Sequence, residues 1–446
     1  MEKQRKDKRI LIVILIAVFL LFGFSLRKSR MEQLFALVSQ YVDSEEGDQS
    51  AKKLKEHKKQ VEDTRILADA AFETAEKPVA EVFEEPETAD GQTDREAQEE
   101  QEEQEGGEEE EFSGRFYYTY LSDSLKVVYK EVYESILSGK ETEVSTLRKE
   151  NLDIAFQCVL NDFPEIFYVN GYHFTEHTRA AETVKLIFSA DYVMTKEEIA
   201  AAQTEIDGYV QRCFAGMGNN MSQYEQVKYI YDYIITNTEY DLNAPNNQNI
   251  CSVFLEGRSV CQGYAEAMAY LLQKRGFVIS VVNGFVENGN RHAWNILMVD
   301  GNYYYLDATW GDVDYQSSEG MDTGIAKEVM PVNYDYFLIT TEQLQITHQI
   351  NNIVSLPACV ATQNNYYRKE GLYFENVDKE KLTVVFQNAK DRGDATVTIK
   401  CSDISAYGEM RAYLLDDQGI FSYIANKKKV TYYDSEQMRT LCFWLE

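Results

Sequence analysis

The chain of 446 residues is predicted to have an α+β fold. Three observations predict this class. Apolar residues recur with helical spacing through 264–272, and two stretches rich in Val and Ile follow at 277–286 and 292–299. An Asp-Gly pair at 300–301 then leads into a tyrosine-rich stretch at 303–307, and strands joined by turns this short pair antiparallel. The sequence therefore predicts a helix packed beside an antiparallel sheet.

The predicted helix carries a candidate nucleophile. Ser259 and Gln262 stand three residues apart before it, as in a capping box, and Gly276 marks its end. With Ser259 as the N-cap, Cys261 lies in the first turn, where free N–H groups and the helix dipole stabilise a thiolate. The simpler interpretation of a lone cysteine is a buried core thiol. That interpretation is expected to hold for the six others, which are Cys158, Cys213, Cys251, Cys359, Cys401 and Cys442.

The hairpin register brings two partners together. A two-residue loop at 300–301 pairs Val299 with Asn302 and puts His292 on the same face as Asp307, about 7 to 8 Å away between backbones. A three-residue loop would put them on opposite faces, and the type I′ preference of Asp-Gly favours the shorter loop. In this arrangement Asp307 would orient the imidazole, while His292 would take the thiol proton and later protonate a leaving amine. Taken without its partner, His292 would be interpreted as a core histidine and Asp307 as the residue that ends a strand.

Three motifs carry a resemblance to a known family. They are Cys-Gln-Gly-Tyr-Ala at 261–265, His-Ala-Trp at 292–294 and Tyr-Leu-Asp-Ala-Thr-Trp at 305–310. In this order they resemble the core of the transglutaminase-like superfamily, a branch of the papain-like cysteine enzymes. The resemblance implies a papain-like core with Cys261 as nucleophile, His292 as base and Asp307 as orienting acid. It also implies acyl transfer through a thioester, but the family includes cross-linkers, amidases, proteases and non-catalytic scaffolds.

Further residues are candidates for the oxyanion site and the cleft. The backbone N–H of Cys261 is the first expected oxyanion donor, and Tyr240 or Gln262 is the second. Tyr240 fits ordinary aromatic packing equally well. Trp294 and Trp310 are expected to be walls of the cleft or plain core. No metal or cofactor is expected, because the chain has no Cys-x-x-Cys pair and no calcium loop like that of animal cross-linking enzymes.

The first 111 residues divide into two segments. Residues 1–30 are predicted to be a cytoplasmic tail and transmembrane signal anchor, with 17 uncharged residues that begin at Ile10 and end at Leu26. Five basic residues before this span and three after it favour an inside N-terminus and an extracellular catalytic domain. Residues 31–111 are predicted to be a disordered linker, because 96–111 alone holds 10 glutamates.

The remaining chain is predicted to form three parts. Residues 112–220 are a helix-rich extension, with helices at 121–137, 147–160 and 195–214 and a strand at 183–188. The transglutaminase-like core occupies 221–355. Residues 356–446 form a small α/β module with strands at 395–401 and within 430–445.

Charge and motifs together limit the function. The net charge is −30, of which −17 belongs to residues 112–446, and a domain this acidic is not expected to bind nucleic acid. The leading hypothesis is a membrane-anchored extracellular cysteine enzyme that transfers or hydrolyses amide acyl groups of a protein or peptide, with a cell-wall-associated substrate as one option. The alternatives are a non-catalytic module that binds peptide or cell-wall polymer, and an assembly partner.

Overall fold

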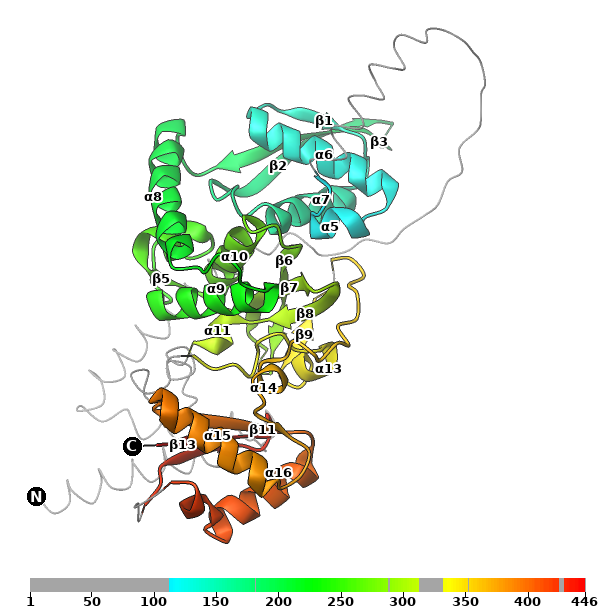
Figure 1. Cartoon of the computed structure of the whole chain (residues 1–446). Helices are drawn as coiled ribbons and strands as arrows, with labels where there is room; N and C mark the ends of the chain where they lie inside the picture. The colour runs from blue at the N-terminus through cyan, green and yellow to red at the C-terminus, as the bar shows by residue number, and fades with distance from the viewer. Residues whose placement is uncertain are drawn as a thin grey trace, which may run out of the picture. The chain divides into compact units, whose positions relative to one another are not determined.

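The computed structural model describes residues 112–180, 182–287, 289–312, 332–351, 353–424 and 429–445. The predicted membrane span and the acidic linker both lie outside these residues. Within the described ranges, no helix is long and apolar enough to cross a bilayer. The described chain mixes helices with mostly antiparallel sheets, which confirms the predicted α+β class (Figure 1).

The first part of the described chain packs helices against a three-stranded sheet of order β1-β3-β2. Its elements are α5 (Phe116–Tyr120), α6 (Asp123–Ser138), β1 (Thr142–Val144), α7 (Lys149–Asp162), β2 (Val169–Arg179) and β3 (Glu182–Tyr192). The two predicted helices correspond to α6 and α7, and the predicted strand to β3. Strand β2 was not predicted, because most of its side chains are polar and exposed and no apolar alternation marks it.

Two capped helices lead into the core. Helix α8 (Lys196–Ala215) begins at Thr195, where the predicted capping box with Glu198 is present in both directions. Helix α9 (Gln223–Asn237) begins with a second capping box, made by Ser222 and Glu225. The apolar faces of α8 and α9 join one hydrophobic cluster with α10 (Cys261–Gln273).

A four-stranded antiparallel sheet of order β8-β7-β6-β9 carries the site. Its strands are β6 (Ile279–Val286), β7 (Arg291–Val299), β8 (Asn302–Leu306) and β9 (His348–Ile350). Val299 pairs with Asn302, as the sequence predicts. Between them, Asp300 has φ 49° and Gly301 has φ 75°, as a type I′ turn requires.

Both faces of this sheet are covered. Helix α10 packs against β6 and β7 on one face, where Val281, Ala293 and Leu297 are buried (Figure 1). On the other face, Val282 and Ile296 share a hydrophobic cluster with the helices of the first part. Since strands covered on both sides hold their side chains in fixed positions, the residues at the ends of β6, β7 and β8 are placed rigidly.

The last part has its own hydrophobic core and a four-stranded sheet of order β10-β11-β13-β12. Its elements are α14 (Tyr366–Lys369), β10 (Tyr373–Phe374), α15 (Lys379–Arg392), β11 (Thr396–Cys401), α16 (Ile404–Arg411), the short helices η3 (Ala412–Asp416) and η4 (Gly419–Ser422), β12 (Tyr432–Ser435) and β13 (Thr440–Trp444). The strands predicted in this part correspond to β11 and β13. A buried ion pair joins it to the core, because Lys400 Nζ lies 2.9 Å from Asp335 Oδ1.

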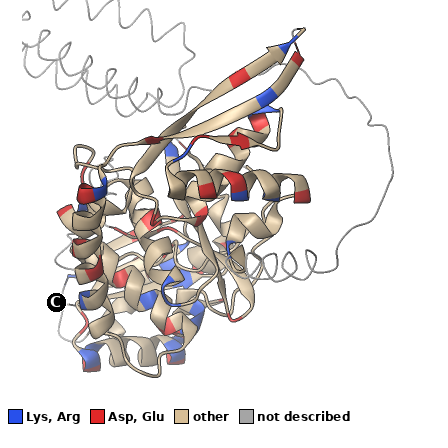
Figure 2. Cartoon of the chain, turned by 90° about the horizontal axis from the view of Figure 1, so that it is seen from above, with Lys and Arg blue, Asp and Glu red and all other residues tan. Residues whose placement is uncertain are grey.

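Charged residues of both signs are interspersed along the helices and on the long β2–β3 hairpin (Figure 2). Two residues of that hairpin form ion pairs with neighbouring elements, Glu176 with Lys149 and Lys185 with Glu143. Such exposed pairs contribute about 0 to 1 kcal/mol each. They keep this surface solvated and do not position the site.

Candidate active site

Cys261 occupies the first turn of α10, as predicted, but the predicted cap is wrong. The N-cap residue is Val260, which makes no side-chain cap bond. Ser259 instead lies in β5 (Arg258–Ser259), which pairs with β4 (Glu239–Tyr240), and its hydroxyl lies 2.6 Å from Ser252 Oγ. The other half of the predicted box is also absent, since the Gln262 amide donates to Glu266 Oε1 at 2.9 Å. The Ser259 hydroxyl therefore bonds to Ser252 and does not cap the helix.

Gly263 lets this turn of α10 approach the preceding segment closely. A Cβ at this position would overlap the Ser259 hydroxyl and would lie 2.6 Å from Ser252 Oγ. Any larger residue would push the start of the helix outward. The glycine of the Cys-Gln-Gly motif therefore helps to fix where the Cys261 thiol lies.

His292 and Asp307 meet at the end of the central hairpin. His292 lies on β7, and its Nε2 is 2.7 Å from Asp307 Oδ2. Asp307 directly follows β8 as the N-cap of the short helix α11 (Ala308–Gly311). Its second oxygen, Oδ1, accepts the backbone N–H of Trp310 at 3.0 Å. The structure thus brings together the two side chains that the hairpin register places on one face.

The pair is buried and ionised. Burial is the largest influence on His292 and lowers its pKa, but the charge and hydrogen bond of Asp307, followed by the Cys261 thiol, outweigh burial and raise this pKa to about 10. For Asp307, burial opposes ionisation. The His292 charge and the histidine hydrogen bonds prevail and hold the Asp307 pKa well below its usual range. Near neutral pH the site therefore contains an imidazolium and a carboxylate.

The Cys261 thiol is a hydrogen-bond partner of His292. Because His292 Nε2 is bonded to Asp307, Nδ1 is the ring nitrogen left for the sulfur. All seven cysteines lie in the described ranges as free thiols, and Cys261 alone is partly exposed. The other six are buried, and burial raises the pKa of each of their thiols. This confirms that they are core thiols, and it leaves Cys261 as the accessible one.

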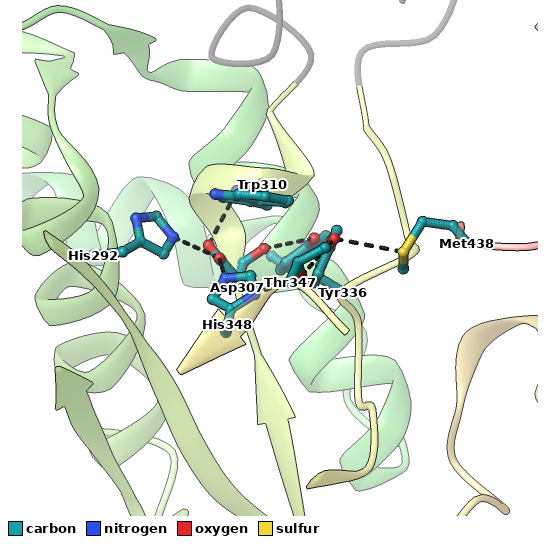
Figure 3. A network of polar contacts seen from close by, with 8 residues as sticks. His292, Asp307, Trp310, Tyr336, Thr347, His348 and Met438 are labelled. Carbon is teal, nitrogen blue, oxygen red and sulfur yellow. Dashed lines mark hydrogen bonds and ion pairs between the residues drawn. The ribbon is translucent and has the colours of Figure 1, made fainter. Parts of the chain in front are cut away.

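A second histidine, His348, also contacts Asp307, and the sequence interpretation missed it. Its Nε2 lies 3.1 Å from Asp307 Oδ2, and its Nδ1 lies 2.8 Å from Thr347 Oγ1 (Figure 3). It starts β9, which joins the sheet beside β6 through the pairing of Val286 with His348. The signal present in the sequence was a histidine within the short alternating stretch 346–350.

The two candidate tryptophans surround these imidazoles. Trp294 is fully buried, with its ring centroid 6.0 Å from that of His292 and 5.0 Å from that of His348. Trp310 is 4.8 Å from His348 and 6.0 Å from His292. The two rings keep water away from the His–Asp contacts, so they are core residues of the site.

The structure places both oxyanion candidates near Cys261. Tyr240 pairs with Ser259 in the β4–β5 bridge, two residues before the cysteine. Gln262 follows the cysteine directly, but its side chain is engaged with Glu266. The Cys261 N–H opens a helix, where N–H groups have no intrahelical acceptor. The Tyr240 side chain packs against two hydrophobic clusters, as ordinary aromatic packing requires, so its pairing with Ser259 alone assigns it no role.

Within the described ranges, one group of side chains has metal-ligand chemistry. The ligand atoms of His292, Asp307 and His348 all lie within 4.8 Å of one another. The N–O distances of 2.7 and 3.1 Å are those of N–H···O hydrogen bonds, so protons already satisfy these contacts. A metal here would also occupy the nitrogen through which Asp307 orients His292.

Fold and site together define an α+β, papain-like core with a cysteine on a helix N-terminus and a His–Asp pair on the adjacent strands. Residues 211–308 match the model of the Transglutaminase-like superfamily. This part of the chain is therefore similar to a superfamily whose members are cysteine protease-like.

Solved structures give more distant matches. A structure described as a TGase is 18% identical over 31% of this chain and 45% of its own, with a TM-score of 0.23. The periplasmic domain of TgpA from Pseudomonas aeruginosa, bound to ethylmercury, is 14% identical over 29% of this chain and 56% of its own, with a TM-score of 0.20. Menin, in a structure showing its binding site for the Mixed Lineage Leukemia protein, is 18% identical over 60% of this chain and 52% of its own, with a TM-score of 0.23. The chain thus spans about half the length of each of these three structures. No curated protein matches it.

Proposed function

We propose that this protein is a cysteine enzyme that cleaves or transfers amide acyl groups. Cys261 is the nucleophile, His292 the acid and base, and Asp307 the group that orients His292. The observation that carries the proposal is the His292 ring, which contacts Asp307 through Nε2 and has the Cys261 thiol as its second partner. Its raised pKa keeps a proton on the ring near neutral pH, ready for a leaving amine.

The proposed reaction has two steps. The Cys261 thiolate attacks the amide carbonyl carbon, and the C–N bond breaks as His292 gives its proton to the departing amine. A thioester remains on Cys261. His292, now neutral, takes a proton from water or from a second amine, which attacks the thioester and releases the acyl group. In this proposal the N–H of Cys261 and the side chain of Tyr240, whose backbone pairs with that of Ser259, stabilise the oxyanion in each step.

The proposed substrate is an amide of a protein or peptide. The proposed location is the outer face of the cell membrane, with the chain anchored by the apolar segment from Ile10 to Leu26, its N-terminus inside, and cell-wall-associated protein within reach. This part rests on the sequence alone, on the uncharged segment and the basic residues that flank it.

A non-catalytic module that binds peptide or cell-wall polymer is the second candidate. The observation that favours it is the enclosure of His292, Asp307 and both tryptophans, since the side chains of His292 and Asp307 are only 2% and 1% exposed. A binding module would need no reactive thiol. The reactivity of Cys261 therefore separates the two candidates.

Labelling with a thiol-reactive probe between pH 5 and 9 tests the proposal. We expect one fast-reacting thiol in the full chain, absent in Cys261→Ala and slowed in His292→Ala. Cys251→Ala is the matched control, because this thiol is buried and its loss should leave fast labelling intact. Uniform slow labelling of all seven cysteines would reject the enzyme.

The reaction type needs a second assay. Incorporation of a fluorescent amine into a glutamine peptide, followed beside ammonia release and peptide cleavage, separates transfer from hydrolysis of a side-chain amide and from proteolysis. Each product must disappear in Cys261→Ala. A product that persists in this variant does not come from the proposed site.

A further inference from the structure

We propose that His348 is a positioning residue of the active site, acting with Thr347 to hold the Asp307 carboxylate that orients His292. The inference rests on the proposed function and goes beyond the cysteine, histidine and aspartate of the superfamily motifs. It identifies a fourth group on β9, outside the segment that matches the family model.

The protonation of His348 follows from its partners. Asp307 is ionised and can only accept hydrogen bonds, so both nitrogens that face Oδ2 must carry protons. Burial lowers the pKa of His348 and, together with the charge of His292, outweighs Asp307, whose hydrogen bond and charge raise this pKa. One carboxylate cannot offset two adjacent imidazolium ions, so His348 is neutral and carries its single proton on Nε2.

Thr347 selects this tautomer. Since Nε2 of the neutral ring holds the proton, Nδ1 is an acceptor, and the Thr347 hydroxyl at 2.8 Å must donate to it. Thr347 Oγ1 in turn lies 3.0 Å from the Tyr336 hydroxyl, which also contacts Met438 Sδ at 3.5 Å. Figure 3 shows these contacts as one chain that leads to Asp307. Because Thr347 gives its one proton to His348, the Tyr336 hydroxyl gives its one proton to Thr347 in this arrangement, and Met438 Sδ is then only a packing neighbour of that hydroxyl.

Packing holds the His348 ring in place. Trp294, Trp310 and Tyr336 surround it, with ring centroids 5.0, 4.8 and 5.3 Å away. The His348 side chain is 0% exposed, so water cannot replace it as a donor. Asp307 Oδ2 is therefore held between two N–H donors, and one of them stays neutral throughout the reaction. Without His348, Oδ2 would lose a fixed donor and the carboxylate could rotate away from His292.

Two substitutions at His348 distinguish a residue that positions Asp307 from one that only fills space. His348→Gln keeps an N–H group close to the position of Nε2, whereas His348→Leu fills the space without a donor. In the full chain we expect His348→Leu to slow alkylation of Cys261 about tenfold, the size of effect that loss of an orienting hydrogen-bond partner has at metal-bound histidines. We expect His348→Gln to restore most of the rate. Thr347→Val, which frees the tautomer, should give an intermediate rate and serves as the test if His348→Leu does not fold.

The matched control is His173→Leu. His173 pairs with Asp191 at 2.9 Å, but this pair is exposed and distant from the site in the sheet of β2 and β3. Its loss should leave alkylation unchanged. If folded His348→Leu reacts at the wild-type rate, His348 only fills space and the proposal is overturned.

A second readout does not depend on the reactivity of Cys261. In the full chain labelled with ¹⁵N-histidine, which has five histidines, the His292 Nε2 proton should give a low-field resonance. We expect this resonance in the wild type, Cys261→Ser and His348→Gln, and its loss or shift in His348→Leu. An unchanged resonance in His348→Leu would refute the inference even if Cys261 proved unreactive. A resonance that appears only after chelation would show a metal held by the two histidines, and would also overturn it.

Discussion

Replacing Asp307 by asparagine tests the electrostatic account of the site. The carboxylate accepts three N–H groups, from His292, His348 and the Trp310 backbone. An asparagine amide keeps the shape of the carboxylate but loses its charge. It also has only one oxygen, so its NH₂ group would face at least one of the three N–H donors that the carboxylate accepts. His292 would then lose the main group that raises its pKa.

The cost can be estimated from the burial of the pair. The His292 and Asp307 side chains are 2% and 1% exposed, and removing one partner of a buried ion pair costs about 3 to 5 kcal/mol. Asp191→Asn is the matched control, because Asp191 pairs with His173 at 2.9 Å, but the two side chains are 48% and 62% exposed. Exposed pairs contribute about 0 to 1 kcal/mol, so this variant should be close to wild type.

The difference should also depend on pH. The folded-state pKa of His292 is raised to about 10, so the stability from its charged form is complete below its unfolded value of about 6.5 and is lost as the pH rises through 10. The Asp307 pKa is lowered, so its contribution is present above about 4 and is lost only in strong acid. The difference in unfolding free energy between wild type and Asp307→Asn should therefore be largest near pH 5 to 6 and smaller above pH 10.

Urea unfolding followed by tryptophan fluorescence measures this gap, because Trp294 and Trp310 both lie against the histidines. The measurement compares wild type, Asp307→Asn and Asp191→Asn at pH 6 and at pH 10.5. A loss below about 1 kcal/mol at pH 6 would mean that the pair is not a buried ion pair. A gap that grows with pH would mean that His292 is neutral at pH 6.

Three further results are expected. The native full chain should have one thiol that labels quickly, and the urea-unfolded chain seven, because six thiols are buried; several fast native thiols would contradict this burial. Gly284→Ala should weaken thermal stability by about 1 to 3 kcal/mol or more, because its Cβ would collide with the β9 backbone, whereas Gly408→Ala, with nothing within 4 Å, should gain up to about 1 kcal/mol. Thr195→Ala should cost about 1 kcal/mol by removing the cap of α8, and Thr204→Ala within the same helix should cost none; equal effects would mean that the capping box adds no stability.

The sequence predicted the local features of the site well. The Asp-Gly pair at 300–301 determined the turn type, and the turn type determined the register that brings His292 to Asp307. The strands at 279–286 and 291–299 and the helix that begins at Cys261 were also predicted, because each has a strong pattern in a continuous stretch.

Features that depend on distant contacts were not predictable in the same way. His348 reaches Asp307 only because β9 adds to the edge of β6, and no local pattern states which edge a three-residue strand joins. Ser259 matches the capping-box pattern, but its bridge to β4 fixes the backbone and directs the hydroxyl to Ser252. In both cases tertiary pairing overrides the local signal.

Acylation by an activated ester tests the central claim most directly. The full chain is mixed with p-nitrophenyl acetate, and the acetyl group is located by mass spectrometry of the intact chain and of its peptides. We predict a burst of about one acetyl group per chain on Cys261, slower in His292→Ala and absent in Cys261→Ala. Acetylation spread over lysines, or an equal burst in Cys261→Ala, would contradict the claim that Cys261 is an activated nucleophile.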